Sequence, residues 1–184
     1  AFMIAVARSL IALIAMLFAF SGAAEAASKA KIDRKVNNAL AEFREDIKGA
    51  DALLSKASGV LVFPSVKKAG FVVGGEGGRG ALRVGGKSVA YYATGAASIG
   101  FQFGAQARRI IFVFLEQSAL DKFRNSENWE IGVDASVAVV TLDAGGEIDA
   151  TKINKPIVAF IFDAKGLMYN LSLEGSKIER IYPD

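Results

Sequence analysis

The stretch from Gly59 to Arg83 constrains the fold more than any other part of this chain. Two short apolar runs, residues 60–63 and 71–73, are β-branched or aromatic and are bounded by glycine or proline, which is typical of strands. A Pro-Ser…Lys-Lys segment separates the two runs and predicts a turn between them. Residues 74–80, which are mainly glycine, then predict a hairpin whose tight bend uses positive φ angles.

The glycine cluster also fits the spacing of a dinucleotide-binding loop, at Gly75, Gly77 and Gly80. Such a loop must open a helix, because the helix N-terminus holds the pyrophosphate. Residues 81–86, which follow the cluster, have the pattern of a strand and a turn. We therefore interpret the cluster as a hairpin and not as a nucleotide site.

Residues 1–26 have the pattern of a secretory signal peptide. Arg8 precedes an apolar segment at residues 10–20, and residues 24–26 satisfy the small-x-small cleavage rule. An uncleaved anchor is the alternative, although the apolar segment is short for a spanning helix. We expect a single domain over residues 27–184 that is periplasmic or exported and soluble after cleavage. It would have no lipid-attachment cysteine, because the chain contains no cysteine.

Apolar residues recur at spacings of three and four between residues 27 and 57, which predicts an amphipathic helix. They are Ile32, Val36, Leu40, Phe43, Ile47, Ala50 and Leu54. Gly49 is expected to split the helix, and Asp51 is available to cap its second part. We interpret the apolar stripe as a face that packs on a sheet. Docking of the basic first turns on a membrane surface is the alternative.

The rest of the chain is expected to be mostly strand. Runs of strand-forming residues occupy residues 81–84, 88–94, 97–105, 109–115, 129–140, 157–162 and 167–173. One short helix is expected at residues 117–125, with Ala119, Leu120 and Phe123 facing inward. The predicted fold class is α+β: an N-terminal amphipathic helix packed on a curved, mostly antiparallel β-sheet that could close like a barrel, with one further short helix.

Histidine and cysteine are absent from all 184 residues. Their absence excludes imidazole general bases, thiol nucleophiles and zinc sites built from His and Cys. No carboxylate lies in an apolar run that would raise its pKa, so we predict that the chain is not an enzyme and uses no cofactor. Acidic residues between Glu127 and Asp149 are expected to form a solvated rim, and calcium binding at residues 143–149 is the alternative.

The distribution of basic side chains is the sequence feature that indicates a function most clearly. Residues 27–109 carry 14 basic and 6 acidic side chains, whereas residues 110–184 carry 7 and 12. A cationic first half attracts phosphate-bearing partners, and export favours membrane headgroups over nucleic acid. Charges that only solubilise loops are the alternative. The basic residues that could converge on one rim are Lys67, Lys68, Arg79, Arg83, Arg108 and Arg109.

Several segments between residues 39 and 181 together match one family pattern. The most specific are Gly59-Val-Leu-Val-Phe-Pro, Lys68-Ala-Gly-Phe, Gly74-Gly-Glu-Gly-Gly-Arg-Gly-Ala, Tyr91-Tyr92, Ser98-Ile-Gly-Phe-Gln-Phe-Gly-Ala-Gln, Ala119-Leu-Asp-Lys-Phe, and Gly166-Leu-Met with Leu171-Ser-Leu-Glu-Gly after it. On these segments the chain resembles the SYLF domain, a lipid-binding module also described as an actin-regulator domain in yeast endocytic proteins. The resemblance is strongest to exported bacterial members of that family.

The resemblance implies non-enzymatic binding, since eukaryotic relatives bind phosphoinositides and, in some cases, actin filaments. Lipid binding is associated there with an N-terminal amphipathic segment and basic residues. The candidate lipid-binding residues would be Lys31, Lys35, Lys67, Lys68, Arg79, Arg83, Arg108 and Arg109. Only Lys68 lies in a family-typical motif, and Asn170 stands where the family pattern has glycine. An exported protein meets neither actin nor phosphoinositides, so an anionic phospholipid or membrane surface is the expected partner, and nucleic acid is not.

Three functional hypotheses are carried forward. The preferred one is binding of anionic phospholipid headgroups or membrane surfaces through the basic half of the chain. The second is a protein-interaction or self-associating structural module of the envelope. The third is an acyl-chain carrier, whose cavity would be lined by Phe71, Phe101, Phe103, Phe112, Phe114 and Phe160.

Overall fold

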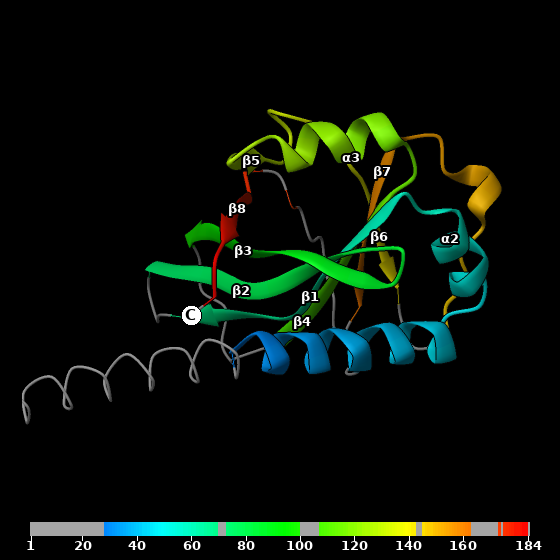
Figure 1. Cartoon of the computed structure of the whole chain (residues 1–184), viewed down its shortest axis with the longest axis horizontal. Helices are drawn as coiled ribbons and strands as arrows, with labels where there is room; N and C mark the ends of the chain where they lie inside the picture. Colours follow the sequence, from blue (N-terminus) through cyan, green and yellow to red (C-terminus); the bar gives the residue numbers. More distant parts are fainter. Residues whose placement is uncertain are drawn as a thin grey trace, which may run out of the picture.

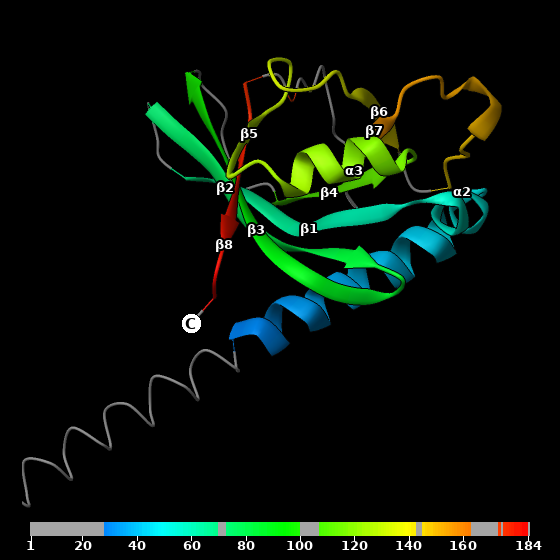
Figure 2. The same cartoon turned by 45° about the horizontal axis from the view of Figure 1, so that its top comes forward.

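The computed structural model of the chain describes residues 28–69, 73–99, 107–142, 145–162, 173 and 175–183. A long helix runs along one face of a twisted sheet, and a shorter helix covers the opposite face (Figure 1). Seen from a second direction, the strands curl into an open half-barrel (Figure 2). This arrangement confirms the predicted α+β class with an N-terminal helix on a curved sheet.

Eight strands form one sheet in the order β5-β8-β3-β2-β1-β4-β7-β6. They are β1 (Gly59–Ala69), β2 (Val73–Val84), β3 (Lys87–Ile99), β4 (Ala107–Phe114), β5 (Asn128–Glu130), β6 (Ala138–Leu142), β7 (Ile157–Phe162) and β8 (Lys177–Ile181). Neighbouring strands are antiparallel except β6 and β7, which are parallel. Because β5 and β6 stand at opposite ends of this order, the sheet of the described residues does not close into a barrel.

The N-terminal helix, described over residues 28–46, packs its apolar stripe on the sheet. Val36 and Phe43 are fully buried. The ring of Phe43 lies 5.5 Å from the ring of Phe160 and 5.4 Å from that of Phe162, both on β7. The interpretation of the stripe as core is therefore confirmed.

Gly49 separates this helix from α2 (Ala50–Lys56), as predicted. Its φ of 88° favours glycine, and a side chain here would also meet the carbonyl oxygen of Ile148 at 2.6 Å. The predicted cap by Asp51 is wrong, because Gly49 holds the N-cap position and no side chain caps α2. Asp51 instead forms an ion pair through Oδ1 with Nε of Arg44, at 3.0 Å.

Successive side chains of the central strands point to opposite faces of the sheet. They therefore form two separate hydrophobic cores, one on each face. On β1, Val60 and Val62 face the N-terminal helix, whereas Leu61 and Phe63 face α3 (Gln117–Arg124). The core under the N-terminal helix also contains Ile111, Val113, Val158 and Phe160. The core under α3 also contains Phe112, Phe114, Phe123 and Trp129. Burial on both faces explains why these strands are continuous apolar runs in the sequence.

The turn predicted at the Pro-Ser segment is wrong, because β1 continues through Pro64 to Ala69. The pairing of β1 shifts register against β2 between Val62 and Lys67, and against β4 just beyond Phe63. The segment is thus a bulge in a central strand. A bulge tolerates proline, which has no N–H to donate to the ladder.

The glycine cluster is not a hairpin bend either, because it lies within β2 and pairs along its length with β3. The β2–β3 turn comes later, at Gly85 and Gly86, whose φ angles are 59° and 78°. Within the cluster, glycine is required because the backbone of the β1 bulge lies too close to leave room for a side chain. A Cβ on Gly80 would collide with the carbonyl oxygen of Val62, and one on Gly78 would lie 2.5 Å from that of Ser65.

The C-terminal half agrees only in part with the predicted elements. Helix α3 and strand β7 are confirmed, and Leu120 and Phe123 are buried. The predicted strand at residues 129–140 is wrong: it is two short strands, β5 and β6, separated by a turn. A short 3₁₀ helix, η1 (Ala150–Lys152), follows β6, and β8 was not predicted. The predicted strands at residues 97–105 and 167–173 lie mostly outside the described residues.

Candidate functional site

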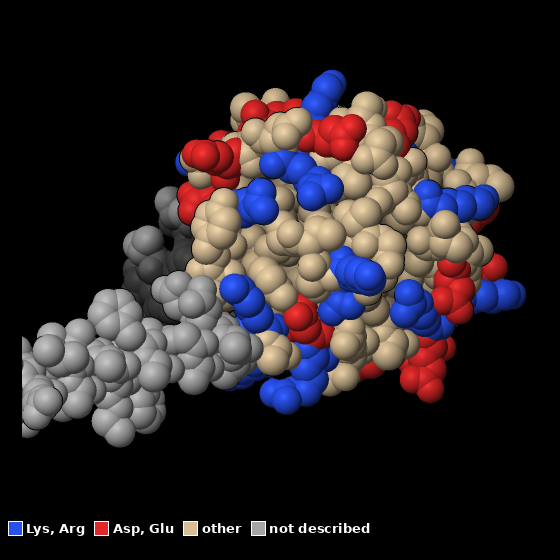
Figure 3. Space-filling model, viewed as in Figure 1, with Lys and Arg blue, Asp and Glu red and all other residues tan. Residues whose placement is uncertain are grey.

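The first turns of the N-terminal helix present cations to solvent. Lys31, Arg34 and Lys35 are exposed and lie outside the buried stripe of the helix. The lower part of the molecule in Figure 3, where this helix lies in Figure 1, carries several Lys and Arg side chains. Two of the candidate residues, Lys31 and Lys35, therefore share one exposed face.

Asp33 is the only acidic residue between residues 28 and 41, and it points toward the sheet. Its Oδ1 accepts a hydrogen bond of 2.6 Å from Ser88 Oγ, and its Oδ2 accepts one of 2.9 Å from the Tyr91 hydroxyl. Burial raises the pKa of Tyr91, and the bond to Asp33 raises it further. The carboxylate of Asp33 is thus engaged with β3.

Arg83 on β2 completes this cluster. Its Nη2 lies 3.7 Å from Asp33 Oδ1 and donates a hydrogen bond of 3.3 Å to the Asp33 carbonyl oxygen. The side chain is only 14% exposed, and its Nε is buried without a hydrogen-bond partner. Arg83 therefore anchors the helix to the sheet.

Arg109 on β4 makes a second anchor further along the helix. Its guanidinium forms an ion pair with Glu42 and donates a hydrogen bond of 3.4 Å from Nη2 to Glu42 Oε1. The same guanidinium lies over the ring of Phe162, 5.8 Å from the centroid. Neither Arg83 nor Arg109 is turned fully to solvent.

The remaining candidates lie at different places on the sheet. Arg79 is exposed on β2, on the same face of that strand as Arg83. Arg108 is half-buried and pairs with Val66, which places it on the opposite face of β4 from Arg109.

Lys67 and Lys68 are strand residues of β1 and not turn residues. Lys67 pairs with Gly77 and Ala107, and Lys68 pairs with Glu76. The side chains of the two lysines lie outside the described part of the structure. Among the candidates whose side chains are described, only Lys31, Lys35 and Arg79 are exposed.

Sequence reasoning missed the polar residues that fix the helix. The apolar spacing that predicts the helix gives no partner for Asp33 or for Glu42, although both bind arginines of the sheet. A signal was available for Asp33, because it is the one acid among the basic first turns and it neighbours the buried Ile32. No comparable signal marks Ser88 or Tyr91, since their role depends on where β3 lies relative to the helix.

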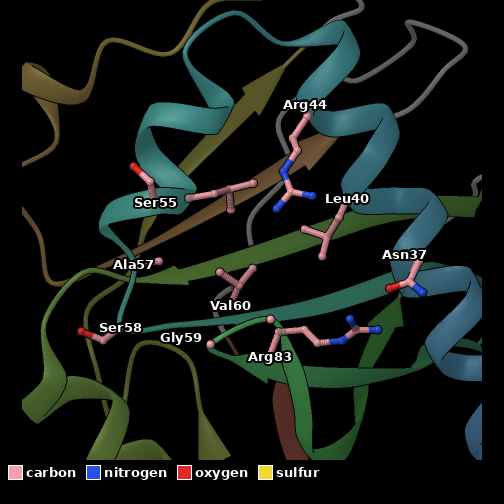
Figure 4. A pocket seen from close by; sticks show the side chains of 12 residues that line it. Asn37, Leu40, Arg44, Ser55, Ala57, Ser58, Gly59, Val60 and Arg83 are labelled. Carbon is pink, nitrogen blue, oxygen red and sulfur yellow. The ribbon is translucent and has the colours of Figure 1, made fainter.

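A pocket of about 510 Å³ lies beside the N-terminal helix (Figure 4). Its walls come from the flank of that helix, the end of α2, the start of β1 and the β2–β3 turn. Arg44 of the helix and Arg83 of β2 both line it. Leu40, Leu54 and Val60 supply an apolar wall.

The aromatic cavity of the acyl-carrier hypothesis is not formed by the residues that are described. Phe112 and Phe114 pack in the core under α3, whereas Phe160 packs under the N-terminal helix. The sheet separates the two groups. Phe71, Phe101 and Phe103 lie outside the described residues.

No three His, Cys, Asp or Glu side chains gather to hold a metal in the part of the chain that the structure describes. Residues 143 and 144, which belong to the calcium alternative, are outside that part. No helix among the described residues is both long enough and apolar enough to cross a bilayer.

Residues 95–181 match the model of a protein family described as Ysc84, Las17-binding protein actin regulator. The chain belongs to the Ysc84, or SYLF, family. One curated relative, the SH3 domain-containing YSC84-like protein 1 of Xenopus laevis, is 32% identical over 129 residues, which cover 67% of this chain and 38% of the relative. The Homo sapiens protein of the same name is 31% identical over 129 residues, covering 67% of this chain and 37% of the relative. The chain thus spans less than two fifths of the length of these relatives.

The Ysc84 match begins within β3 and ends in β8. It includes β4, α3 and β7, and so both Arg108 and Arg109. The N-terminal helix, α2, β1 and β2 precede it. The exposed cations at Lys31 and Lys35 therefore lie outside the segment that matches the Ysc84 model.

Proposed function

We propose that this member of the Ysc84 family binds the surface of membranes that contain anionic phospholipids, without catalysing a reaction. One observation carries the proposal. Lys31, Arg34 and Lys35 face solvent, while Asp33, the only acid nearby in the helix, is engaged with Ser88 and the sheet. The first turns of the helix therefore present positive charge with no exposed carboxylate among them.

The binding is electrostatic and shallow. The apolar stripe of the helix is buried on the sheet, so a docked helix has no apolar face to insert between lipids. Each Lys or Arg near an anionic bilayer contributes about 1 kcal/mol, so three exposed cations give about 3 kcal/mol. Such charges are screened over about 8 Å at physiological ionic strength, so the binding is reversible and sensitive to salt.

The membrane in this proposal lies on the exported side of the cell, with residues 1–26 acting as a signal peptide. An exported protein does not meet actin filaments or phosphoinositides. An anionic phospholipid is the partner whose chemistry suits both the family and this location.

The test is co-sedimentation of residues 27–184 with vesicles. Vesicles of phosphatidylcholine alone are compared with vesicles that also contain phosphatidylglycerol, each at low and at high salt. The proposal predicts sedimentation only with the anionic vesicles, and loss of that binding at high salt. Equal binding to neutral vesicles, or no binding to either, would contradict it.

The description of the family favours a second candidate function, which is binding to a protein partner. That description names Las17 binding and actin regulation, and both are protein interactions. For this chain the corresponding function would be an envelope interaction or self-association module. It predicts association in analytical ultracentrifugation that phosphatidylglycerol vesicles do not change.

A further inference from the structure

We propose that the pocket between the N-terminal helix, α2 and the β2–β3 turn binds a small phosphate ester through Arg44 and Arg83. The site is distinct from the exposed cationic face at Lys31 and Lys35. Surface binding and pocket binding can therefore succeed or fail separately.

The charged groups that line the pocket are all positive. Its lining contains two arginines and no aspartate or glutamate in the described part of the chain. The carboxylates that pair with these arginines, Asp33 and Asp51, lie outside the lining. An anion is therefore the kind of ligand that the pocket attracts.

Each arginine keeps donors for a ligand after forming its ion pair, as far as its contacts with the described residues go. Arg44 pairs with Asp51 through Nε, which leaves its two terminal nitrogens. Arg83 pairs with Asp33 through Nη2, which leaves Nη1. A planar guanidinium matches the oxygens of a phosphate group with paired hydrogen bonds.

Arg83 is also held in place before any ligand arrives. Its contacts with Asp33 fix the guanidinium, so binding costs little further side-chain entropy. Its buried Nε has no hydrogen-bond partner. A buried donor without a partner calls for a physical explanation. Because Nε itself is inaccessible, a ligand in the pocket would be met by a terminal nitrogen of Arg83.

The size and the apolar wall indicate an ester and not inorganic phosphate. About 510 Å³ is within the range of small-molecule sites, which is roughly 300–1,000 Å³. Leu40, Leu54 and Val60 form a surface that a short carbon chain can cover. Glycerol phosphate has this combination, either as a lipid headgroup or as a free ester.

Isothermal titration calorimetry with glycerol 3-phosphate tests the site, with inorganic phosphate and glycerol as comparison ligands. Glycerol 3-phosphate should bind residues 27–184 at least several-fold more tightly than inorganic phosphate, and glycerol should not bind. Arg44→Gln should weaken binding about tenfold, because it removes charge-assisted hydrogen bonds. The side chain of Arg44 is 49% exposed, so this variant is expected to fold.

Neighbouring asparagines provide a matched pair of variants. Asn37 lines the pocket, and its amide points into it in Figure 4, whereas Asn38, which is also exposed, is not part of the lining. Asn37→Glu should abolish binding of glycerol 3-phosphate, while Asn38→Glu, with the same change of charge, should keep it within about twofold. Circular dichroism verifies that both variants are folded.

Phosphatidylglycerol vesicles distinguish the two sources of the ester. Competition between vesicles and glycerol 3-phosphate identifies a lipid headgroup, and binding of glycerol 3-phosphate without competition identifies a free ester. The proposal is overturned if wild-type protein does not bind glycerol 3-phosphate, if inorganic phosphate binds as tightly, or if Asn37→Glu and Asn38→Glu weaken binding equally. Loss of vesicle binding in Lys31→Glu/Lys35→Glu with intact binding of glycerol 3-phosphate would show that the two sites are independent.

Discussion

The hydroxyl of Tyr91 on β3 donates a hydrogen bond of 2.9 Å to Oδ2 of Asp33 on the N-terminal helix. This bond joins residues 58 positions apart in the chain. It directs the one acid of the first helical turns toward the sheet. The outer face of the same turns is left with Lys31, Arg34 and Lys35.

Replacing Asp33 by asparagine should destabilise the fold. The change removes the ion pair with Arg83 and weakens the bonds from Ser88 and Tyr91, leaving a half-buried guanidinium without its carboxylate. We expect Asp33→Asn to lower the free energy of unfolding by about 1–2 kcal/mol in urea titrations. Asp46→Asn, at an exposed position of the same helix, should change it by less than about 0.5 kcal/mol. Equal stability of the two variants would contradict the anchoring role of Asp33.

Tyr91 and Tyr92 should respond in opposite ways to loss of their hydroxyl groups. Tyr91→Phe removes the bond to Asp33 and should cost about 1 kcal/mol of unfolding free energy. Tyr92 faces the core under α3, and its hydroxyl oxygen is buried without a partner. Tyr92→Phe should therefore be neutral or stabilising. Differential scanning calorimetry compares the two, and a larger loss in Tyr92→Phe than in Tyr91→Phe would refute this assignment.

Stability should fall at alkaline pH. Burial and the bond to Asp33 raise the pKa of Tyr91 above 10.0, so the folded state holds this proton more tightly than the unfolded chain. The resulting stabilisation is complete below about pH 10 and is lost as the pH rises through the raised pKa. Burial raises the pKa of Tyr92 in the same direction. In urea titrations between about pH 8 and pH 11, Tyr91→Phe should lose stability less steeply than wild type, and parallel curves would argue against this linkage.

Two glycines of β2 should differ sharply in their tolerance of alanine. A Cβ at Gly80 would collide with the backbone of Val62 in the β1 bulge, whereas one at Gly77 meets its nearest atom, the carbonyl oxygen of Thr94, at 3.7 Å. Gly80→Ala should lower the unfolding free energy by about 1–3 kcal/mol or more. Gly77→Ala should be neutral or slightly stabilising, because it restricts the unfolded chain. Similar urea midpoints for the two variants would show that the close approach at Gly80 is not required.

Local periodicity was sufficient to predict several elements. Val36 and Phe43 belong to a stripe with helical spacing, and the stripe predicts a helix wherever the rest of the chain lies. The same applies to β7, an uninterrupted apolar run, and to α3, where Leu120 and Phe123 are spaced for one face.

The wrong predictions concern residues whose conformation depends on a neighbouring strand that is distant in the sequence. Pro64 indicates a turn by itself, but β2 and β4 pair around it and leave a bulge. Gly80 indicates flexibility by itself, but its requirement comes from Val62 in the neighbouring strand. For the candidate site, positive charge alone made Lys31 and Arg83 equally plausible as lipid-binding residues. In the structure Arg83 pairs with Asp33 between the helix and the sheet, whereas Lys31 is exposed. The direction in which Asp33 points distinguishes the two, and it depends on the tertiary structure.

The most direct test of the account is vesicle co-sedimentation with two charge-reversed variants of residues 27–184. Lys31→Glu/Lys35→Glu changes the exposed face of the helix, and Lys122→Glu/Lys177→Glu makes the same change of charge at exposed positions of α3 and β8. We predict that the first variant loses at least about tenfold in affinity for phosphatidylglycerol vesicles and that the second binds like wild type. Equal loss in both variants, or none in either, would contradict binding through the N-terminal helix.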